Sequence, residues 1–452
     1  MSVGRKIIVV GGLAAGPSAA SKAARVNPDA EVVLFEQGEH VSYGICEIPY
    51  YLGGEVKKEG LVTFTPETLR EKKRVDARVL HRVEEILPTK KLVKVRDLRM
   101  GKVFEEKYDR LIIATGSSPR LLGLSGENAR NVFTIKSLDG AFTLHKYLDE
   151  EKPNRTVIVG GGYIGMEMAD ALRARGLEVT LLHRHSLPMV GLERDTRERV
   201  REELEAHGVT FVAHAKTEGF VLGKDQRVTH VVTSEGSYET DLVILSLGVA
   251  PNSTLARNAG VRTGTTGGII TDQRQETNLD NIYAAGDCCE VKNLVTNKGM
   301  FLPLATVASK AAWVAGENAA GGRAEFRGAI RAIAVRVFDI EVVQVGIGSE
   351  EAKAAGFDVL TETITAWSKV AVMPESSRVT VRLIADRKSK RLLGANLYGK
   401  EGAVLRAHAL AVAIQHRITI DEMQQWDLAY SPPFTPLWDP ILVAANAMKK
   451  KM

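Results

Sequence analysis

The sequence predicts an α/β fold with two similar β–α–β units, followed by a third domain of the α+β type. Three observations predict this. A strand, a glycine-rich turn, a helix and a second strand occur twice, at 6–36 and 155–184; apolar strands ending in glycine follow each copy; and the pattern changes after about residue 325. Because β–α–β units place their strands in parallel, the two copies indicate parallel sheets.

The composition fits a multidomain globular protein and excludes several classes. With 452 residues, 44% hydrophobic and 25% charged, the chain is long enough for two to four domains. The net charge of +5 comes without a basic stripe interleaved with aromatics, so we expect no nucleic acid partner. Three cysteines cannot form a disulfide framework. A strand begins at Lys6, with no signal peptide before it, and no apolar run reaches the roughly 18 residues of a membrane span. We therefore expect no membrane partner and a cytoplasmic enzyme.

The first unit reads KIIVVGGLAAGPSAASKAARVNPDAEVVLFE (6–36). Its glycine-rich turn lets the backbone approach a pyrophosphate at a helix N-terminus, as in Rossmann-like dinucleotide-binding domains. The candidate contacts in this turn are Gly11, Gly12, Leu13, Ala14, Ala15, Gly16 and Pro17. Glu36 ends the second strand, followed by Gln37, and its carboxylate suits the hydroxyls of an unphosphorylated adenosine ribose, as in FAD.

The second unit reads RTVIVGGGYIGMEMADALRARGLEVTLLHR (155–184), and its glycine pattern is complete. The candidate contacts are Gly160, Gly162, Tyr163, Ile164, Gly165, Glu167, His183 and Arg184. Arg184 stands near the place of the expected acid and would accommodate a 2′-phosphate, which favours NADPH, with NADH possible. The alternatives are that Arg184 merely faces solvent, and that one of the two turns is a decayed copy.

Three later segments have the same character. Residues 111–116 form an apolar strand ending in Ala114-Thr115-Gly116, and residues 243–248 repeat it, ending in Gly248. Residues 277–287 form a short strand that ends in Gly286-Asp287, where the carboxylate could reach a ribityl or ribose hydroxyl.

The third region has no nucleotide motif. Strand-like runs at 335–338 and 379–383 and a helix over 402–415 indicate an α+β domain, and four prolines make the tail after Tyr430 irregular and stiff. We place the domain limits at 1–117 with 246–324, at 118–245, and at 325–452.

Cys46 is alone in SYGICEIPYY (42–51), without a second cysteine at a dithiol or zinc spacing. Taken by itself, such a residue is a buried apolar thiol more often than a reactive one. Cys288 and Cys289 follow Asp287 directly and are interpreted as structural.

The order of these motifs resembles the FAD-dependent pyridine nucleotide–disulfide oxidoreductases, over essentially the whole chain. SYGICEIPYY and DLAYSPPFTPLWDP (427–440) resemble the single-cysteine branch, which holds coenzyme A disulfide reductases, CoA-linked persulfide or polysulfide reductases, and NAD(P)H oxidases and peroxidases. The resemblance implies FAD on the first unit, NAD(P)H on the second, and a homodimer formed by a C-terminal dimerisation domain, each active site borrowing the partner's tail.

The resemblance also implies roles for single residues. It makes Cys46 and Tyr430 catalytic, adds Gly248 to the NAD(P)H site and Val83, Pro303, Leu304 and Ala305 to the FAD site, and implies no metal. The implied contacts for coenzyme A are Ser18, Lys22, Arg25, Ser42, Tyr430 and Trp438; a solvated polar face is the alternative for the three on the first helix.

Four positions depart from relatives of this branch. Ala14 replaces the histidine of the peroxidases and oxidases, which favours CoA chemistry. Ile45, Glu47 and the lack of a tyrosine before Pro374 differ from the CoA disulfide reductases.

We therefore predict an FAD-dependent NAD(P)H:disulfide oxidoreductase with one redox-active cysteine, acting on CoA disulfide or on a CoA persulfide or polysulfide. The alternatives are an NAD(P)H oxidase that reduces O2 and an electron-transfer flavoprotein that acts on a protein partner. Flavin, a helix N-terminus and nearby cations are expected to favour the Cys46 thiolate.

Overall fold

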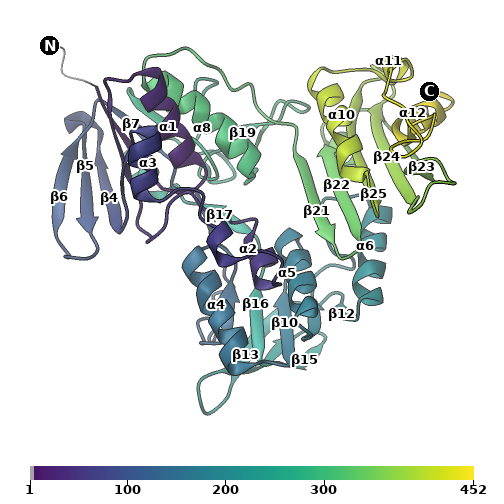
Figure 1. Cartoon of the computed structure of the whole chain (residues 1–452), viewed down its shortest axis with the longest axis horizontal. Coiled ribbons are helices and arrows are strands. Elements are labelled where there is room, and N and C mark those ends of the chain that lie inside the picture. Colours follow the sequence, from purple (N-terminus) through teal and green to yellow (C-terminus); the bar gives the residue numbers. More distant parts are fainter. Residues whose placement is uncertain (1–4) are drawn as a thin grey trace.

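The computed structural model describes residues 5–452, which contain three five-stranded sheets, each with its own helical cover (Figure 1). Two of the sheets are parallel and the third is antiparallel. The predicted α/β class with two Rossmann-like units is confirmed. No helix within residues 5–452 is both long and apolar enough to cross a membrane.

The first parallel sheet has the strand order β18-β7-β1-β2-β3. Its strands are β1 (Lys6–Val10), β2 (Glu31–Phe35), β3 (Asp76–Arg78), β7 (Arg110–Ile113) and β18 (Ile282–Ala284). Successive side chains of a strand point to opposite faces. Accordingly, Ile7 and Val9 pack against helices α1 (Ala15–Val26) and α8 (Ala305–Ala319). Ile8 and Val10 pack against a three-stranded sheet, β4 (His81–Leu87), β5 (Leu92–Asp97) and β6 (Val103–Lys107).

The second parallel sheet has the order β12-β11-β10-β16-β9. Its strands are β9 (Val132–Thr134), β10 (Arg155–Val159), β11 (Glu178–Leu182), β12 (Val209–Val212) and β16 (Leu242–Leu245). One face is covered by α4 (Leu138–Glu151), α5 (Tyr163–Ala174) and α6 (Arg194–Ala206). The other face packs against the strands β13 (Thr217–Leu222), β14 (Val228–Thr233) and β15 (Gly236–Glu239).

The third sheet is antiparallel, with the order β21-β22-β25-β24-β23. Its strands are β21 (Ala332–Val337), β22 (Ile340–Gly346), β23 (Val359–Trp367), β24 (Arg378–Asp386) and β25 (Leu392–Gly399). Helices α10 (Ala403–Gln415) and α12 (Pro440–Lys449) cover it, joined through the short α11 (Ile420–Met423). The strands expected at 335–338 and 379–383 and the helix expected at 402–415 are present; the exact domain limits stay a prediction.

Short segments join the domains around one place. The helix α2 (Ile48–Leu52) leaves the first domain and packs against α4 and α5 of the second (Figure 1). Its Ile48 and Leu52 are fully buried there. Strand β21 of the third domain also contacts α5. The residues just before α2 therefore lie where all three domains meet.

Candidate active site

The loop that carries Cys46 is fastened to the first glycine-rich turn. Ser42, at a positive φ of 50°, donates its backbone N–H to the Gly12 carbonyl oxygen at 2.8 Å. The Ser42 carbonyl accepts from the Thr63 N–H at 2.8 Å. Cys46 is exposed and comes two residues before α2. This arrangement brings the thiol to the seam between the two parallel-sheet domains.

The polypeptide by itself disfavours the Cys46 thiolate. Although the residue is exposed, neighbouring atoms keep water from the thiol and so raise its pKa, and the carboxylates of Glu167 and Glu47 raise it further. Lys136 is the cation that opposes them. The expected lowering of the pKa by nearby cations and a helix N-terminus is therefore wrong for the protein groups alone, because carboxylates and desolvation outweigh one lysine.

Lys136 was not predicted from the sequence. It follows β9, and its Nζ donates to the Ser117 hydroxyl at 2.9 Å and lies 3.4 Å from an Asp287 carboxylate oxygen. The Ser117 hydroxyl donates to the same oxygen of Asp287 at 2.9 Å. This group ties the end of the second sheet to the Gly286-Asp287 corner of the first domain.

The first glycine-rich turn has the shape expected of an FAD cradle. A Cβ on Gly16 would collide with the Gly11 carbonyl oxygen, and one on Gly286 would lie 2.7 Å from the Ala15 Cβ. Glu36 accepts from the Gly12 N–H at 2.6 Å and from the Gly38 N–H at 2.7 Å. Burial raises the pKa of Glu36 although these N–H groups oppose the rise. These residues fit a dinucleotide with free ribose hydroxyls.

The other candidate FAD residues belong to the first domain and lie after β2 and β7, on β4 and at the start of α8. Thr115 donates its hydroxyl to the Asn252 carbonyl at 2.6 Å, which holds the end of β7. A Cβ on Gly116, with φ at +67°, would meet no atom within 4 Å, so the backbone is open on that side. Ala114 and Val83 are buried, Gln37 is exposed, and Pro303, Leu304 and Ala305 form the entry to α8.

The second glycine-rich turn has the same geometry as the first, except that a histidine takes the place of the glutamate. A Cβ on Gly165 would collide with the Gly160 carbonyl oxygen, whereas one on Gly162 would meet nothing within 4 Å. The Gly161 N–H donates to Nδ1 of His183 at 3.1 Å, as the Gly12 N–H donates to Glu36. His183 thus replaces the acid of the first unit.

His183 is buried and neutral. Burial and the neighbouring charges of His185 and Arg197 lower its pKa to about 4. Because Nδ1 accepts a hydrogen bond, we assign the proton to Nε2, which has no partner among the described residues. A neutral imidazole in place of a carboxylate puts no negative charge near the exposed Arg184, which fits a phosphorylated ribose.

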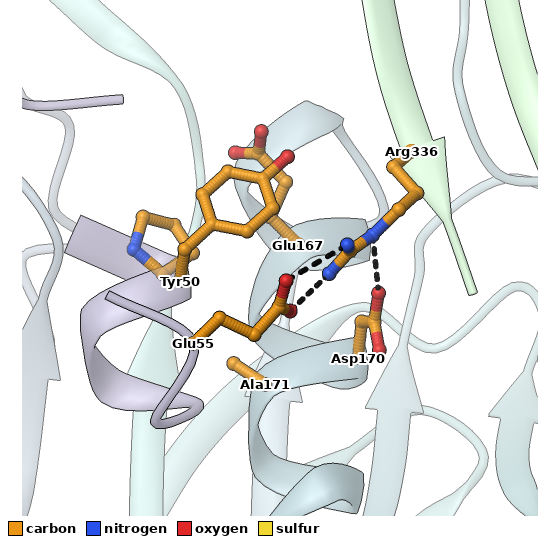
Figure 2. Close-up of a pocket in the computed structure, with 7 residues that line it drawn as sticks. Tyr50, Glu55, Glu167, Asp170, Ala171 and Arg336 are labelled. Atoms are coloured by element: carbon orange, nitrogen blue, oxygen red, sulfur yellow. Dashed lines mark hydrogen bonds and ion pairs between the residues drawn. The ribbon is translucent and has the colours of Figure 1, made fainter. Parts of the chain in front are cut away.

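Glu167 lies on α5 in a small pocket shared by all three domains (Figure 2). Burial raises its pKa to about 7. The Tyr50 hydroxyl points toward the same side as its carboxylate, and Arg336 from β21 lies 5.0 Å above the Tyr50 ring. Arg336 forms ion pairs with Glu55 and, at 3.3 Å, with Asp170. Arg336 thereby links the segment after α2 to α5.

The C-terminal tail is irregular, as expected, and buried hydrogen bonds fix its position. Asp439 accepts from the Arg406 guanidinium and from the Thr435 hydroxyl, each at 2.9 Å, in a buried network. Large side chains face outward from this segment: Tyr430, Phe434, Leu437 and Trp438 are each about half exposed or more. The segment between α11 and α12 lies at the opposite end of the third domain from α2 (Figure 1).

The remaining candidates lie on α1. Ser18 shares a hydrogen bond of 3.3 Å with Ser309 of α8, and Lys22 and Arg25 lie on the same side of the helix, beside Trp313. The structure therefore groups the turn, Cys46 and Glu167 in one seam. Ser18, Lys22 and Arg25 lie along the helix that leads away from that seam.

Comparison with known proteins places the chain. Residues 5–312 match the pyridine nucleotide-disulphide oxidoreductase family, and residues 333–440 match the dimerisation domain of the same family. The chain therefore belongs to the pyridine nucleotide-disulphide oxidoreductases, a family of enzymes that depend on FAD and NAD(P)H. The family resemblance predicted from the sequence is confirmed.

Three similar proteins represent the activities met within the family. An NAD(P)H sulfur oxidoreductase (CoA-dependent) from Pyrococcus furiosus is 36% identical over 447 residues, covering 98% of this chain and 99% of that one. A coenzyme A disulfide reductase from Staphylococcus haemolyticus is 30% identical over 435 residues, covering 95% and 96%. The solved structure of a water-forming NADH oxidase from Lactobacillus brevis, bound to NADH, superposes with a TM-score of 0.94 at 29% identity, covering 99% and 98%.

Proposed function

We propose that this enzyme moves two electrons from NAD(P)H, by way of FAD, to a sulfur–sulfur bond of a coenzyme A species, with Cys46 as the redox-active thiol. One observation carries the proposal: Cys46 is the only exposed cysteine within residues 5–452, and it stands at the seam of the two dinucleotide-binding units. Cys288 and Cys289 are buried. The second sulfur of the reaction then comes from the substrate.

The net reaction is NAD(P)H, a proton and CoA–S–S–R giving NAD(P)⁺, CoA–SH and R–SH, where R is a second CoA in the disulfide, hydrogen in a CoA persulfide, or the remaining sulfur chain in a CoA polysulfide. The Cys46 thiolate attacks one sulfur, the substrate S–S bond breaks, and a mixed disulfide forms as one thiolate leaves. Two electrons then reduce that mixed disulfide and free the second thiol. FAD supplies the hydride acceptor that passes the electron pair to sulfur.

The chain's own residues prepare this exchange. Lys136 is the cation that favours the Cys46 thiolate, and Glu167, with a pKa of about 7, can hold a proton at neutral pH. Gly12, Gly16, Glu36 and Asp287, with the other residues of the first cradle, would hold FAD.

The second cradle would hold the nicotinamide dinucleotide, with Arg184 facing a 2′-phosphate, which makes NADPH the preferred cofactor. The buried, neutral His183 would put no negative charge beside that phosphate. NADH use at lower efficiency is compatible with this arrangement.

The CoA part of the proposal depends on α1 and on a second subunit. Ser18, Lys22, Arg25 and Ser42 would line the CoA path of one subunit. Tyr430 and Trp438 would come from the partner in a homodimer, because the tail lies far from α2 of its own chain (Figure 1). Tyr430 would then protonate the leaving thiolate. A cytoplasmic setting agrees with a chain whose cysteines include one exposed thiol.

Anaerobic turnover of CoA disulfide by the wild type and by Cys46→Ser tests the proposal. We expect the wild type to oxidise NADPH and release CoA thiol, and Cys46→Ser to lose that activity while retaining FAD. A Cys46→Ser variant with full disulfide turnover would refute the role of Cys46. Fast NADPH consumption under air with no anaerobic disulfide reduction would assign the enzyme to the oxidases.

A further inference from the structure

A half-exposed tryptophan on α8 lies beneath two cations of α1. Trp313 projects from α8 and is 50% exposed. The Lys22 Nζ and the Arg25 guanidinium carbon each lie 5.0 Å from its ring centroid. No sequence motif selects Trp313, because its neighbours Lys22 and Arg25 are about 290 residues away in the chain.

This group is held in a fixed arrangement by close helix packing. A Cβ on Gly316 would collide with the Ala19 carbonyl oxygen, so the two helices touch through their backbones (Figure 1). Glu317, one turn after Trp313, holds the Lys22 Nζ at 2.7 Å. Lys22 is thereby kept beside the indole ring.

A half-exposed indole ring with two cations over it offers the two features that a nucleotide needs, an aromatic surface and positive charge. Bases stack on indole rings, and lysine and arginine form charge-assisted hydrogen bonds with phosphate oxygens. A purely apolar ligand would make no use of the positive charge of Arg25, and a simple anion would leave the ring uncovered. The chemistry therefore fits a phosphorylated adenosine.

The position of the group along α1 matches the length of coenzyme A. Ser42, in the Cys46 loop, is hydrogen-bonded to Gly12 at the start of the turn, so Lys22 and Arg25 lie toward the distant end of α1. At 1.5 Å per residue, the rise from Ala14 to Lys22 is about 12 Å. The pantetheine arm is roughly as long as four extended residues, about 14 Å. A thiol at Cys46 would thus leave the nucleotide near Trp313.

We propose that Trp313 is the stacking platform for the adenine ring of coenzyme A, with Lys22 and Arg25 beside its phosphates. This inference rests on the proposed CoA-dependent function and extends it to a residue on α8. Glu317 acts as a positioning residue, since its carboxylate orients Lys22 and would repel a phosphate placed against it.

Calorimetry with adenosine 3′,5′-bisphosphate, the nucleotide end of CoA, tests the proposal on the FAD-loaded protein with NADP⁺ in excess to occupy the second cradle. We expect Trp313→Ala to weaken binding about tenfold and Trp313→Phe to retain it within about threefold, because phenylalanine still stacks. Trp367→Ala is the matched control: Trp367 is also partly exposed, with the Arg378 guanidinium 3.9 Å from its ring, but lies on β23. The control should bind as the wild type does.

Equal affinity of Trp313→Ala and the wild type would overturn the proposal, and so would a wild type that does not bind the bisphosphate. If Trp313→Ala loses affinity and its oligomeric mass also changes, Trp313 belongs to a subunit contact. That result would overturn the proposal as well.

Kinetics separate this inference from the proposed function. With CoA disulfide, Trp313→Ala should raise KM about tenfold at unchanged kcat, whereas pantethine, which lacks the nucleotide, should show no change. An equal rise of KM for both substrates would contradict stacking on adenine. The enzyme could also bind the bisphosphate through Trp313 and yet fail to reduce CoA disulfide. That result would support the nucleotide site and refute the proposed reaction.

Discussion

Replacing Glu167 by glutamine should make the protein more stable at alkaline pH. Glu167 is largely buried on α5, and burial raises its pKa to about 7 from an ordinary 4.5. The folded state therefore binds this proton more tightly than the unfolded state does. Ionising the carboxylate costs stability, which is lost progressively as the pH rises from 4.5 through 7.

The size of the effect follows from the two pKa values. A difference of about 2.5 at 1.36 kcal/mol per pH unit sets an upper limit of about 3.4 kcal/mol. The pKa of about 7 already includes the opposing effect of Arg336; because Glu167 keeps some contact with solvent, we expect about 2–3 kcal/mol above pH 8. Below pH 4.5 the wild type and Glu167→Gln should be equally stable.

Thermal unfolding between pH 5 and pH 8.5 measures this difference. At about 2 °C per kcal/mol, Glu167→Gln should unfold some 4–6 °C above the wild type at pH 8.5, and the gap should close toward pH 5. Glu55→Gln is a control of opposite sign, because the hydrogen bond from Arg336 lowers the pKa of Glu55. Parallel curves for the wild type and Glu167→Gln, or a variant that loses stability at pH 8.5, would refute the reasoning.

The other predictions concern the thiol and the two cradles. Lys136→Met should raise the pKa of Cys46 and slow its alkylation by iodoacetamide at pH 7, and Glu47→Gln should accelerate it; identical pH profiles would contradict the stated charge effects. Because Cys288 and Cys289 are buried, labelling of the folded protein reports Cys46. Gly16→Ala should cost about 1–3 kcal/mol or more and yield colourless protein, since its Cβ collides with the Gly11 carbonyl; normal FAD content would contradict this. Arg184→Glu should raise KM for NADPH about tenfold, or 1.4 kcal/mol, and leave that for NADH nearly unchanged; equal changes in both would contradict a 2′-phosphate contact.

Features that depend on local pattern could be predicted from the sequence. The two glycine-rich turns, the acid at Glu36 and the helix over 402–415 all rest on short-range periodicity or on spacing within one β–α–β unit. The structure places Glu36 against the Gly12 N–H, and the same spacing in the second unit places His183 against the Gly161 N–H. The sequence pattern shared by the two units thus gives the same backbone geometry in both.

Features that depend on domain packing could not be predicted. Lys136, Trp313 and Arg336 come from three separate elements, and none stands in a motif of its own. Their partners Asp287, Lys22 and Glu55 are between 151 and 291 residues away. The effect of the protein groups on the Cys46 pKa could not be predicted for the same reason, because Glu167 approaches the thiol only once α2 packs against α5.

The central claim is that the sulfur which pairs with Cys46 comes from coenzyme A. Intact-mass spectrometry of the protein purified without reductant tests it most directly, with Cys46→Ser measured alongside. We predict a wild-type species heavier by the mass of one coenzyme A less two hydrogens, removed by dithiothreitol and absent from Cys46→Ser. An unmodified wild type that acquires no such adduct from added CoA disulfide would contradict the account.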